Sequence, residues 1–157
     1  AKDFFNHTGK TALQSILPLL PKSPILLVHN TFTKREDMLQ ALSNYEKLFW
    51  CTCPKANLFI ENQLPNYQQF IDAKAKMTIG TDSLASNDTL CILEEMKTIQ
   101  SFVSLELLIE WACKNGSEFL GLDYLGSFQK GKVPGINHIT NIVDGKLTNK
   151  SQVKKIF

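Results

Sequence analysis

The sequence has few of the features that mark secreted, membrane-spanning or nucleic-acid-binding proteins. It carries only 4 cysteines in 157 residues, and its formal net charge of +2 is spread over scattered lysines. No apolar run approaches the ~20 residues that a membrane-spanning helix needs. No charged leader is followed by an apolar segment. We therefore expect a cytoplasmic protein with reduced thiols, no membrane contact and no nucleic-acid partner.

The chain does contain enough apolar residues, 43%, for one packed core, and enough charged residues, 20%, for solubility. Short apolar runs predict strands over residues 25–28, 48–52 and 77–79. Apolar spacing of three and four residues predicts helices over residues 10–20, 34–44, 66–73, 89–99 and 104–114. This alternation predicts an α/β fold with a parallel sheet and right-handed crossovers.

Local signals predict where several elements begin and end. Thr33 and Glu36 fit a capping box at the start of the second helix. Pro18 predicts a break in the first helix, and the Asn-Gly pair at 115–116 predicts the end of the helix over 104–114. Residues 117–120 are compatible with one more helical turn.

The final part of the chain has a different pattern. An Asp-Gly pair at residues 144–145 stands between two apolar runs, which is typical of a β-hairpin. Residues 127–157 are therefore expected to form an antiparallel β appendage and not another strand–helix unit.

Two titratable residues stand at the carboxyl ends of predicted strands. His29 follows the strand at 25–28, and Asp82 follows the strand at 77–79. The carboxyl ends of parallel strands lie at one edge of a sheet, where active sites are built. We therefore expect the imidazole and the carboxylate to converge on one metal ion or one bound water. A catalytic zinc usually has three protein ligands, so this pair alone is an incomplete set.

Other candidate groups have simpler interpretations. His7 and His138 are expected to be structural or surface residues. Cys51 and Cys53 are expected in the core, because free cysteines are usually buried. The pair of glutamates at 94–95 is expected on a solvated helix face, or near a helix start where it would cap charges.

Several motifs carry a resemblance to a known family. Residues 80–87 (GTDSLASN) resemble the last barrel strand and following loop of metal-dependent amidohydrolases, in the branch of chlorohydrolases and nucleoside or adenine-type deaminases. Residues 53–58 (CPKANL) look like that branch's segment after the preceding strand, and His29 looks like its strand-six histidine. Residues 125–132 (LGSFQKGK) are similar to its closing glycine-lysine motif. Within the branch, residues 57–66 look most like aminodeoxyfutalosine deaminases.

The resemblance implies both a fold and a function. Residues 1–126 would be the C-terminal portion of a TIM (β/α)8 barrel, about its last three βα units, and residues 127–157 would return to a small β-sandwich domain. The implied reaction is hydrolytic deamination of an amino-substituted heterocycle that uses one divalent metal ion, zinc or iron. The family's other metal-binding histidines would lie upstream of Ala1, in the N-terminal remainder of the same protein. This segment alone would then be inactive.

The resemblance also implies roles for individual residues. Asp82 would bind the metal and accept the proton of the attacking water. His29 would orient the hydroxide or the developing oxyanion. Asn57 would contact the substrate or support a residue that does, and Ser86 would contact the substrate. Ser83, Ser86 and Asn87 would hold the loop after Asp82 in shape.

Two other function classes stay open from the sequence. The chain would be a non-catalytic binding or assembly module if it binds no metal and pairs with itself through exposed strand edges. It would be a different hydrolase if Ser83 were a nucleophile, but the Gly-x-Ser-x-Gly elbow of α/β-hydrolases is missing. A bound metal separates the first class from the enzyme.

Overall fold

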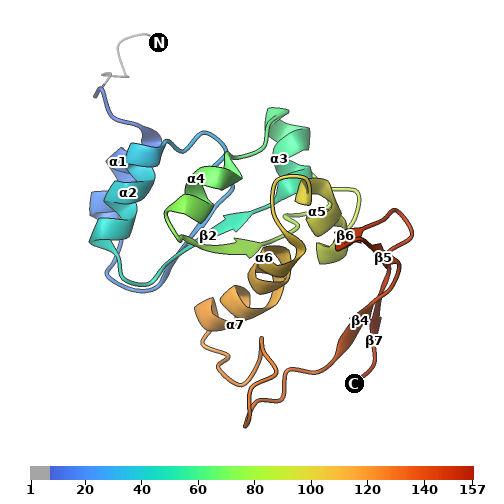
Figure 1. Cartoon of the computed structure of the whole chain (residues 1–157). Helices are drawn as coiled ribbons and strands as arrows, with labels where there is room; N and C mark the ends of the chain where they lie inside the picture. The colour runs from blue at the N-terminus through green and yellow to red at the C-terminus, as the bar shows by residue number, and fades with distance from the viewer. Residues whose placement is uncertain (1–7) are drawn as a thin grey trace.

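The computed structural model describes residues 8–157, and its body is a three-stranded parallel sheet covered by helices (Figure 1). The strands lie in the order β1 (Ile25–Val28), β2 (Leu48–Thr52) and β3 (Lys76–Ile79). In the register of the sheet, Val28 pairs with Cys51 and Cys51 pairs with Thr78. The three strands therefore end at one edge, and the predicted α/β class with a parallel sheet is confirmed.

Helices make the connections between the strands. Helix α1 (Ala12–Ile16) and the short 3-10 helix η2 (Leu17–Leu19) precede β1. The crossovers contain α2 (Arg35–Asn44) before β2, and α3 (Pro54–Glu61) and α4 (Tyr67–Asp72) before β3. After β3 come α5 (Ile92–Ile99), α6 (Leu105–Ile109), the π-helical turn η3 (Glu110–Lys114) and α7 (Asn115–Phe119).

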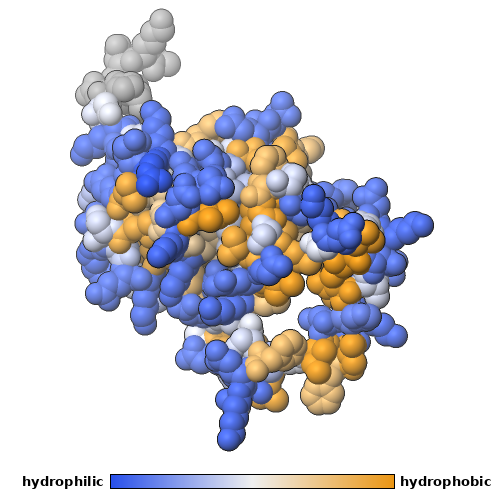
Figure 2. Space-filling model, in the orientation of Figure 1, coloured by the Kyte–Doolittle hydropathy of each residue, from blue (hydrophilic) through white to orange (hydrophobic). Residues whose placement is uncertain are grey.

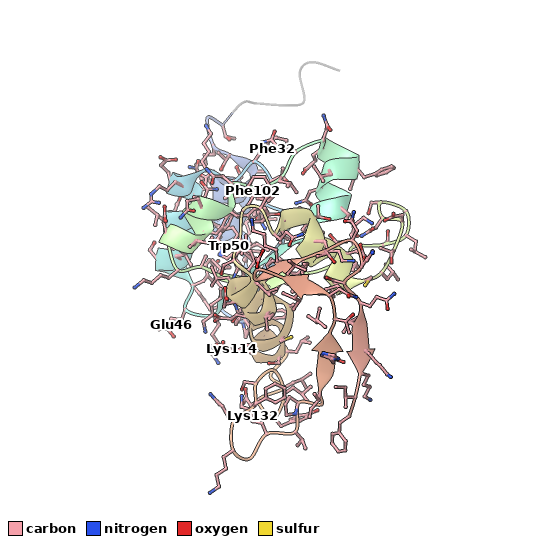
Figure 3. All side chains as sticks on the ribbon, turned by 45° about the vertical axis from the view of Figure 1, so that its right-hand side comes forward. Phe32, Glu46, Trp50, Phe102, Lys114 and Lys132 are labelled. Carbon is pink, nitrogen blue, oxygen red and sulfur yellow. The ribbon has the colours of Figure 1, made fainter. Side chains whose placement is uncertain are left out.

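The apolar core lies between the sheet and the helices. Trp50 of β2 is fully buried, and Figure 3 shows it in the interior of the molecule. Its ring meets Phe70 of α4 edge to face, with the centroids 5.3 Å apart, which is a favoured arrangement of two aromatic rings. Met77 of β3 and Leu108 of α6 belong to the same cluster of buried side chains. This cluster holds the helices against the sheet.

Two predicted helix ends are wrong. Helix α2 has Lys34 at its N-cap and no side-chain cap hydrogen bond, so Thr33 and Glu36 form no capping box. The helical run also continues through the Asn-Gly pair, because Asn115 is buried and its Nδ2 donates to the carbonyl oxygen of Met77, 2.8 Å away. The predicted break at Pro18 is confirmed, since α1 gives way there to a 3-10 turn.

The C-terminal strands form an arm beside α5 and α6, on the side away from α1 and α2 (Figure 1). Strand β4 (Asn137–Ile139) pairs antiparallel with β7 (Val153–Lys155), and β5 (Ile142–Val143) with β6 (Lys146–Leu147). The turn between β5 and β6 has φ of 48° at Asp144 and 71° at Gly145, as a two-residue hairpin requires. The predicted hairpin is confirmed, while a return to a β-sandwich domain stays a prediction.

The arm is attached to the body through a few specific contacts. Leu147 is buried in the core cluster, and its N–H donates to the Gln100 side chain over 2.8 Å. Lys97 of α5 donates to the carbonyl oxygen of Ser151, 2.9 Å away. Figure 2 shows hydrophobic residues over the middle of this face and along the arm, with mostly hydrophilic residues over α1 and α2. Among the described residues, no helix has the length and apolar character needed to span a membrane.

Candidate active site

The chain turns abruptly where β1 and β3 end. His29, Asn30 and Asp82 have φ values of 68°, 56° and 57°, a left-handed conformation that is uncommon for residues other than glycine. The N–H of His29 still donates to the carbonyl oxygen of Cys51 on β2, 2.9 Å away. The Asn30 side chain donates back to the carbonyl oxygen of Leu27 over 2.7 Å. These bonds fix the turn at the point where the imidazole leaves the sheet.

The structure brings the two predicted strand-end residues together. Nε2 of His29 lies 3.8 Å from Oδ2 of Asp82, and the two side chains are 35% and 33% exposed. That separation is too long for a direct hydrogen bond. The two groups therefore face each other across a gap that is open to solvent.

Asn57 determines which ring nitrogen of His29 carries the proton. Its Oδ1 lies 2.7 Å from Nδ1 of His29, and the residue is fully buried in α3. An amide oxygen only accepts hydrogen bonds, so Nδ1 of the neutral imidazole is the donor and Nε2 presents its lone pair toward Asp82. Because Asn57 is buried, it reaches a substrate only through His29.

The Asp82 carboxylate is held in its ionised form. Ser86 Oγ donates to Oδ2 over 2.8 Å. This bond is the main cause that lowers the pKa of Asp82, and the backbone N–H of Ser83 and the nearby His29 act in the same direction. The carboxylate keeps further acceptor sites. It is therefore suited to bind a cation at the edge of the sheet.

Asn87 fixes the loop that carries Asp82. One N–H of its side chain donates to the carbonyl oxygen of Thr81 over 2.7 Å, and the other donates to Oε1 of Glu95 over 2.6 Å. The predicted role of Ser86 and Asn87 in shaping this loop is confirmed by these bonds.

Of the two expectations for Glu95, the solvated position is wrong, because this residue is fully buried. Its Oε2 accepts a hydrogen bond from the backbone N–H of Lys55, 2.9 Å away. Burial raises its pKa, against the effect of the donors. A signal was present in the sequence: Glu95 is three residues after Ile92 and four before Ile99, so it shares their buried helix face.

Two cysteines lie under the site. Cys51 and Cys53 are buried as predicted, in a small cluster with Ala56. Both sulfur atoms adjoin Gly80, where an added Cβ would lie 2.9 Å from Sγ of Cys51 and 3.2 Å from Sγ of Cys53. A hydrogen bond from Cys53 lowers the pKa of the Cys51 thiol to about 7, while the same bond and burial raise the pKa of Cys53.

A hollow of about 410 Å³ adjoins the Asp82 loop. Phe59 of α3 and Leu84 give it apolar walls, and Lys55, Ser86 and Asn87 add polar groups. Ser86, which donates to Asp82, is shared by the hollow and the candidate site, whereas His29 and Asp82 do not line the hollow.

His138 is not part of this site. His138 is exposed on β4 in the C-terminal arm, and His7 lies outside the described residues. In residues 8–157, no group of three or more histidine, cysteine, aspartate or glutamate side chains could hold a metal ion. Asp82 fits one position of a metal site, and the remaining ligands would have to come from elsewhere.

Comparisons with solved structures relate the fold to known enzymes. Aminofutalosine deaminase of Helicobacter pylori superimposes with a TM-score of 0.68 at 23% identity, over 76% of this chain and 31% of that one. An adenosine deaminase of Xanthomonas campestris with bound zinc gives a TM-score of 0.70 at 22% identity, over 82% and 31%. The sheet and its helices thus have the fold of part of a TIM-type barrel, although residues 8–157 form no closed barrel.

Sequence comparisons lead to the same group of proteins. The 5-methylthioadenosine/S-adenosylhomocysteine deaminase of Halalkalibacterium halodurans is 28% identical over 107 residues, which cover 62% of this chain and 24% of that enzyme. The chain thus spans about a quarter of the length of this relative. Residues 7–155, nearly the whole chain, match the amidohydrolase family. The chain that carries the strand-end histidine and aspartate therefore belongs to the amidohydrolase family.

Proposed function

We propose that this chain forms one side of the active site of a metal-dependent deaminase that hydrolyses the amino group from an adenosine-like heterocycle. The observation that carries the proposal is the approach of His29 Nε2 to Asp82 Oδ2 at the carboxyl edge of the sheet, 3.8 Å apart. Similarity to a deaminase named for 5-methylthioadenosine and S-adenosylhomocysteine supports this substrate class. The chain would supply the last three βα units of the barrel, as the resemblance implied.

The metal would be held only in part by this chain. A divalent ion, zinc or iron, lowers the pKa of a bound water and so supplies a hydroxide near neutral pH. Asp82 would contribute one carboxylate ligand, and the solved neighbour with bound zinc supports a metal of this kind. The other ligands would come from the N-terminal remainder of the same protein, with a second copy of the chain as the alternative source.

The residues of this chain have distinct tasks in that reaction. Asp82 takes the proton of the attacking water, and Ser86 holds its Oδ2 in place for this transfer. The lone pair on Nε2 of His29 accepts a hydrogen bond from the second hydrogen of that water, and so orients the hydroxide that forms. Asn57 keeps the ring in the required tautomer through its bond to Nδ1.

The hollow beside Ser86 is suited to the part of the substrate that does not react. Phe59 and Leu84 offer apolar contact area, and the ion pair of Lys55 with Asp88 lines its polar side. Binding of a remote group in such a pocket holds the reacting carbon in position.

The decisive experiment measures ammonia release by the complete gene product that carries this sequence. Adenosine, 5-methylthioadenosine and S-adenosylhomocysteine would be supplied with zinc or iron, and metal content would be measured in parallel. Asp82→Asn should abolish turnover, because the amide cannot take the proton and binds a cation weakly.

Asp144→Asn is the matched control. Asp144 is an aspartate in the same left-handed conformation, with φ of 48°, but it lies in the turn between β5 and β6. Its substitution should leave turnover unchanged. A protein that binds no metal and releases no ammonia from any of the three substrates would favour the non-catalytic binding module instead.

A further inference from the structure

Glu95 carries a fully buried carboxylate to which the proposed reaction assigns no task. Its two oxygens each accept a hydrogen bond, Oε2 from the backbone N–H of Lys55 at 2.9 Å and Oε1 from Nδ2 of Asn87 at 2.6 Å. An ionised carboxylate accepts at both oxygens, whereas a glutamine side chain offers one acceptor and one donor group. The position therefore requires glutamate if both bonds are to form.

One of these bonds leads to the histidine half of the site. Lys55 is the second residue of α3 (Pro54–Glu61), and the N–H groups of a first helical turn have no partner within the helix. Glu95 thus caps α3 from a helix that is distant in the sequence. Two residues further along α3, Asn57 holds the ring of His29.

The other bond leads to the aspartate half. The second N–H of the Asn87 side chain donates to the carbonyl oxygen of Thr81, 2.7 Å away. That carbonyl belongs to the peptide bond immediately before Asp82. The Asn87 oxygen also accepts from the N–H of Thr89 over 3.2 Å, so its amide has a fixed orientation.

We propose that Glu95 is a positioning residue that sets the separation between His29 and Asp82 by linking α3 to the Asp82 loop. The inference rests on the proposed use of His29 and Asp82, but it concerns their geometry and not the reaction. Such outer partners fix the orientation of groups that bind a metal or a water. A second connection lies at the surface, where the Lys55 ammonium pairs with the exposed carboxylate of Asp88 in the same loop.

The neighbouring residue Glu94 provides a matched control. Its carboxylate is 41% exposed and pairs with Lys97 of the same helix, 2.7 Å away. Glu94→Gln and Glu95→Gln remove the same charge from the same helix, but only the second breaks the link. A difference between the two variants therefore measures the link and not the charge.

The experiment uses the isotopically labelled 157-residue chain at about pH 7. Three NMR signals are read: amide exchange at Lys55, the carbon shifts of Asp82 that report its left-handed backbone, and the cross-relaxation between the His29 ring and the Asp82 side chain. Glu95→Gln should accelerate Lys55 exchange about tenfold or shift the Asp82 signals, since one bond must be lost. In either case the His29–Asp82 cross-relaxation should weaken, and Glu94→Gln should leave all three signals unchanged.

Asn87→Ala removes the bond between Glu95 and the Asp82 loop and keeps the bond between Glu95 and Lys55. It tests the proposed link even if Glu95→Gln does not fold. It should shift the Asp82 signals and weaken the cross-relaxation while Lys55 exchange stays slow. Unchanged His29–Asp82 cross-relaxation in the folded variants, or an equal loss in Glu94→Gln, would overturn the proposal. Failure of the proposed function appears differently, as absent ammonia release by a protein in which these NMR signals are intact.

Discussion

The apolar core and the carboxyl edge of the sheet both contain buried side chains, but different forces hold them. Trp50, Phe70 and Met77 pack between the sheet and the helices, where non-directional hydrophobic contact dominates. At the carboxyl edge, the buried groups include Asn57 and Glu95, which are held by specific hydrogen bonds. Packing in the core thus maintains the fold, while hydrogen bonds at the carboxyl edge fix the positions of individual side chains. Substitutions in the two regions should therefore differ in size and in kind.

The largest effect is expected in the core. Phe70→Ala removes a fully buried ring that packs against Trp50 with the centroids 5.3 Å apart. The free energy of unfolding should fall by about 3–5 kcal/mol, because the lost contacts leave a cavity. Urea unfolding followed by tryptophan fluorescence measures this value. A loss below about 1 kcal/mol would contradict the assignment of Phe70 to the tightly packed core.

A smaller effect is expected where the two regions meet, at Gly80. Gly80→Ala places a Cβ 2.9 Å from the sulfur of Cys51 and 3.2 Å from that of Cys53. The crowding should cost about 1–3 kcal/mol of unfolding free energy. Adding Cys51→Ala removes the nearer sulfur and should recover part of the loss. The same urea titration on both variants checks the pair, and an equal loss in the double variant would exclude sulfur crowding as the cause.

The polar edge should also respond to pH through Glu95. Burial raises its pKa above the ordinary value of 4.5, so the folded state binds the proton more tightly than the unfolded state. Its contribution to stability is therefore present at low pH and is lost as pH rises through 4.5 toward the raised pKa. The unfolding free energy of the unmodified chain relative to Glu95→Gln should fall over this range, because glutamine does not titrate. A difference that rises with pH would contradict this sign.

The smallest effect is expected at the solvent-exposed surface. Lys114, labelled in Figure 3, pairs with Glu110 four residues earlier at 3.4 Å, and the two side chains are 56% and 41% exposed. Lys114→Ala should change the unfolding free energy by less than about 0.5 kcal/mol, since water and salt screen such pairs. A larger loss would mean that the lysine stem supports η3 by packing.

Several features of the fold could be predicted from short stretches of sequence. The strand at 25–28 and the hairpin at residues 144–145 follow from local apolar runs and turn residues. His29 and Asp82 could be predicted because each lies at the carboxyl end of a strand, and parallel strands bring these ends together. The family resemblance followed from the motif around Asp82 and agrees with the match over residues 7–155.

The wrong predictions concern residues whose hydrogen-bond partners lie far away in the sequence, so that a local sequence pattern misled. The Asn-Gly pair at 115–116 did not end the helix, because the Asn115 amide is used by the carbonyl oxygen of Met77. Glutamates are usually solvated, but Glu95 is buried because two donors from separate segments face its carboxylate.

The sequence by itself therefore determined the parallel α/β pattern, the two strand-end residues and the C-terminal hairpin, because apolar periodicity and turn chemistry act over a few neighbouring residues. Only the tertiary structure decided the 3.8 Å approach of His29 to Asp82, the orientation of the imidazole by Asn57 and the link through Glu95. Each of these depends on hydrogen bonds between residues far apart in the chain. Such bonds are directional, so they exist only once packing has placed donor and acceptor at the right distance.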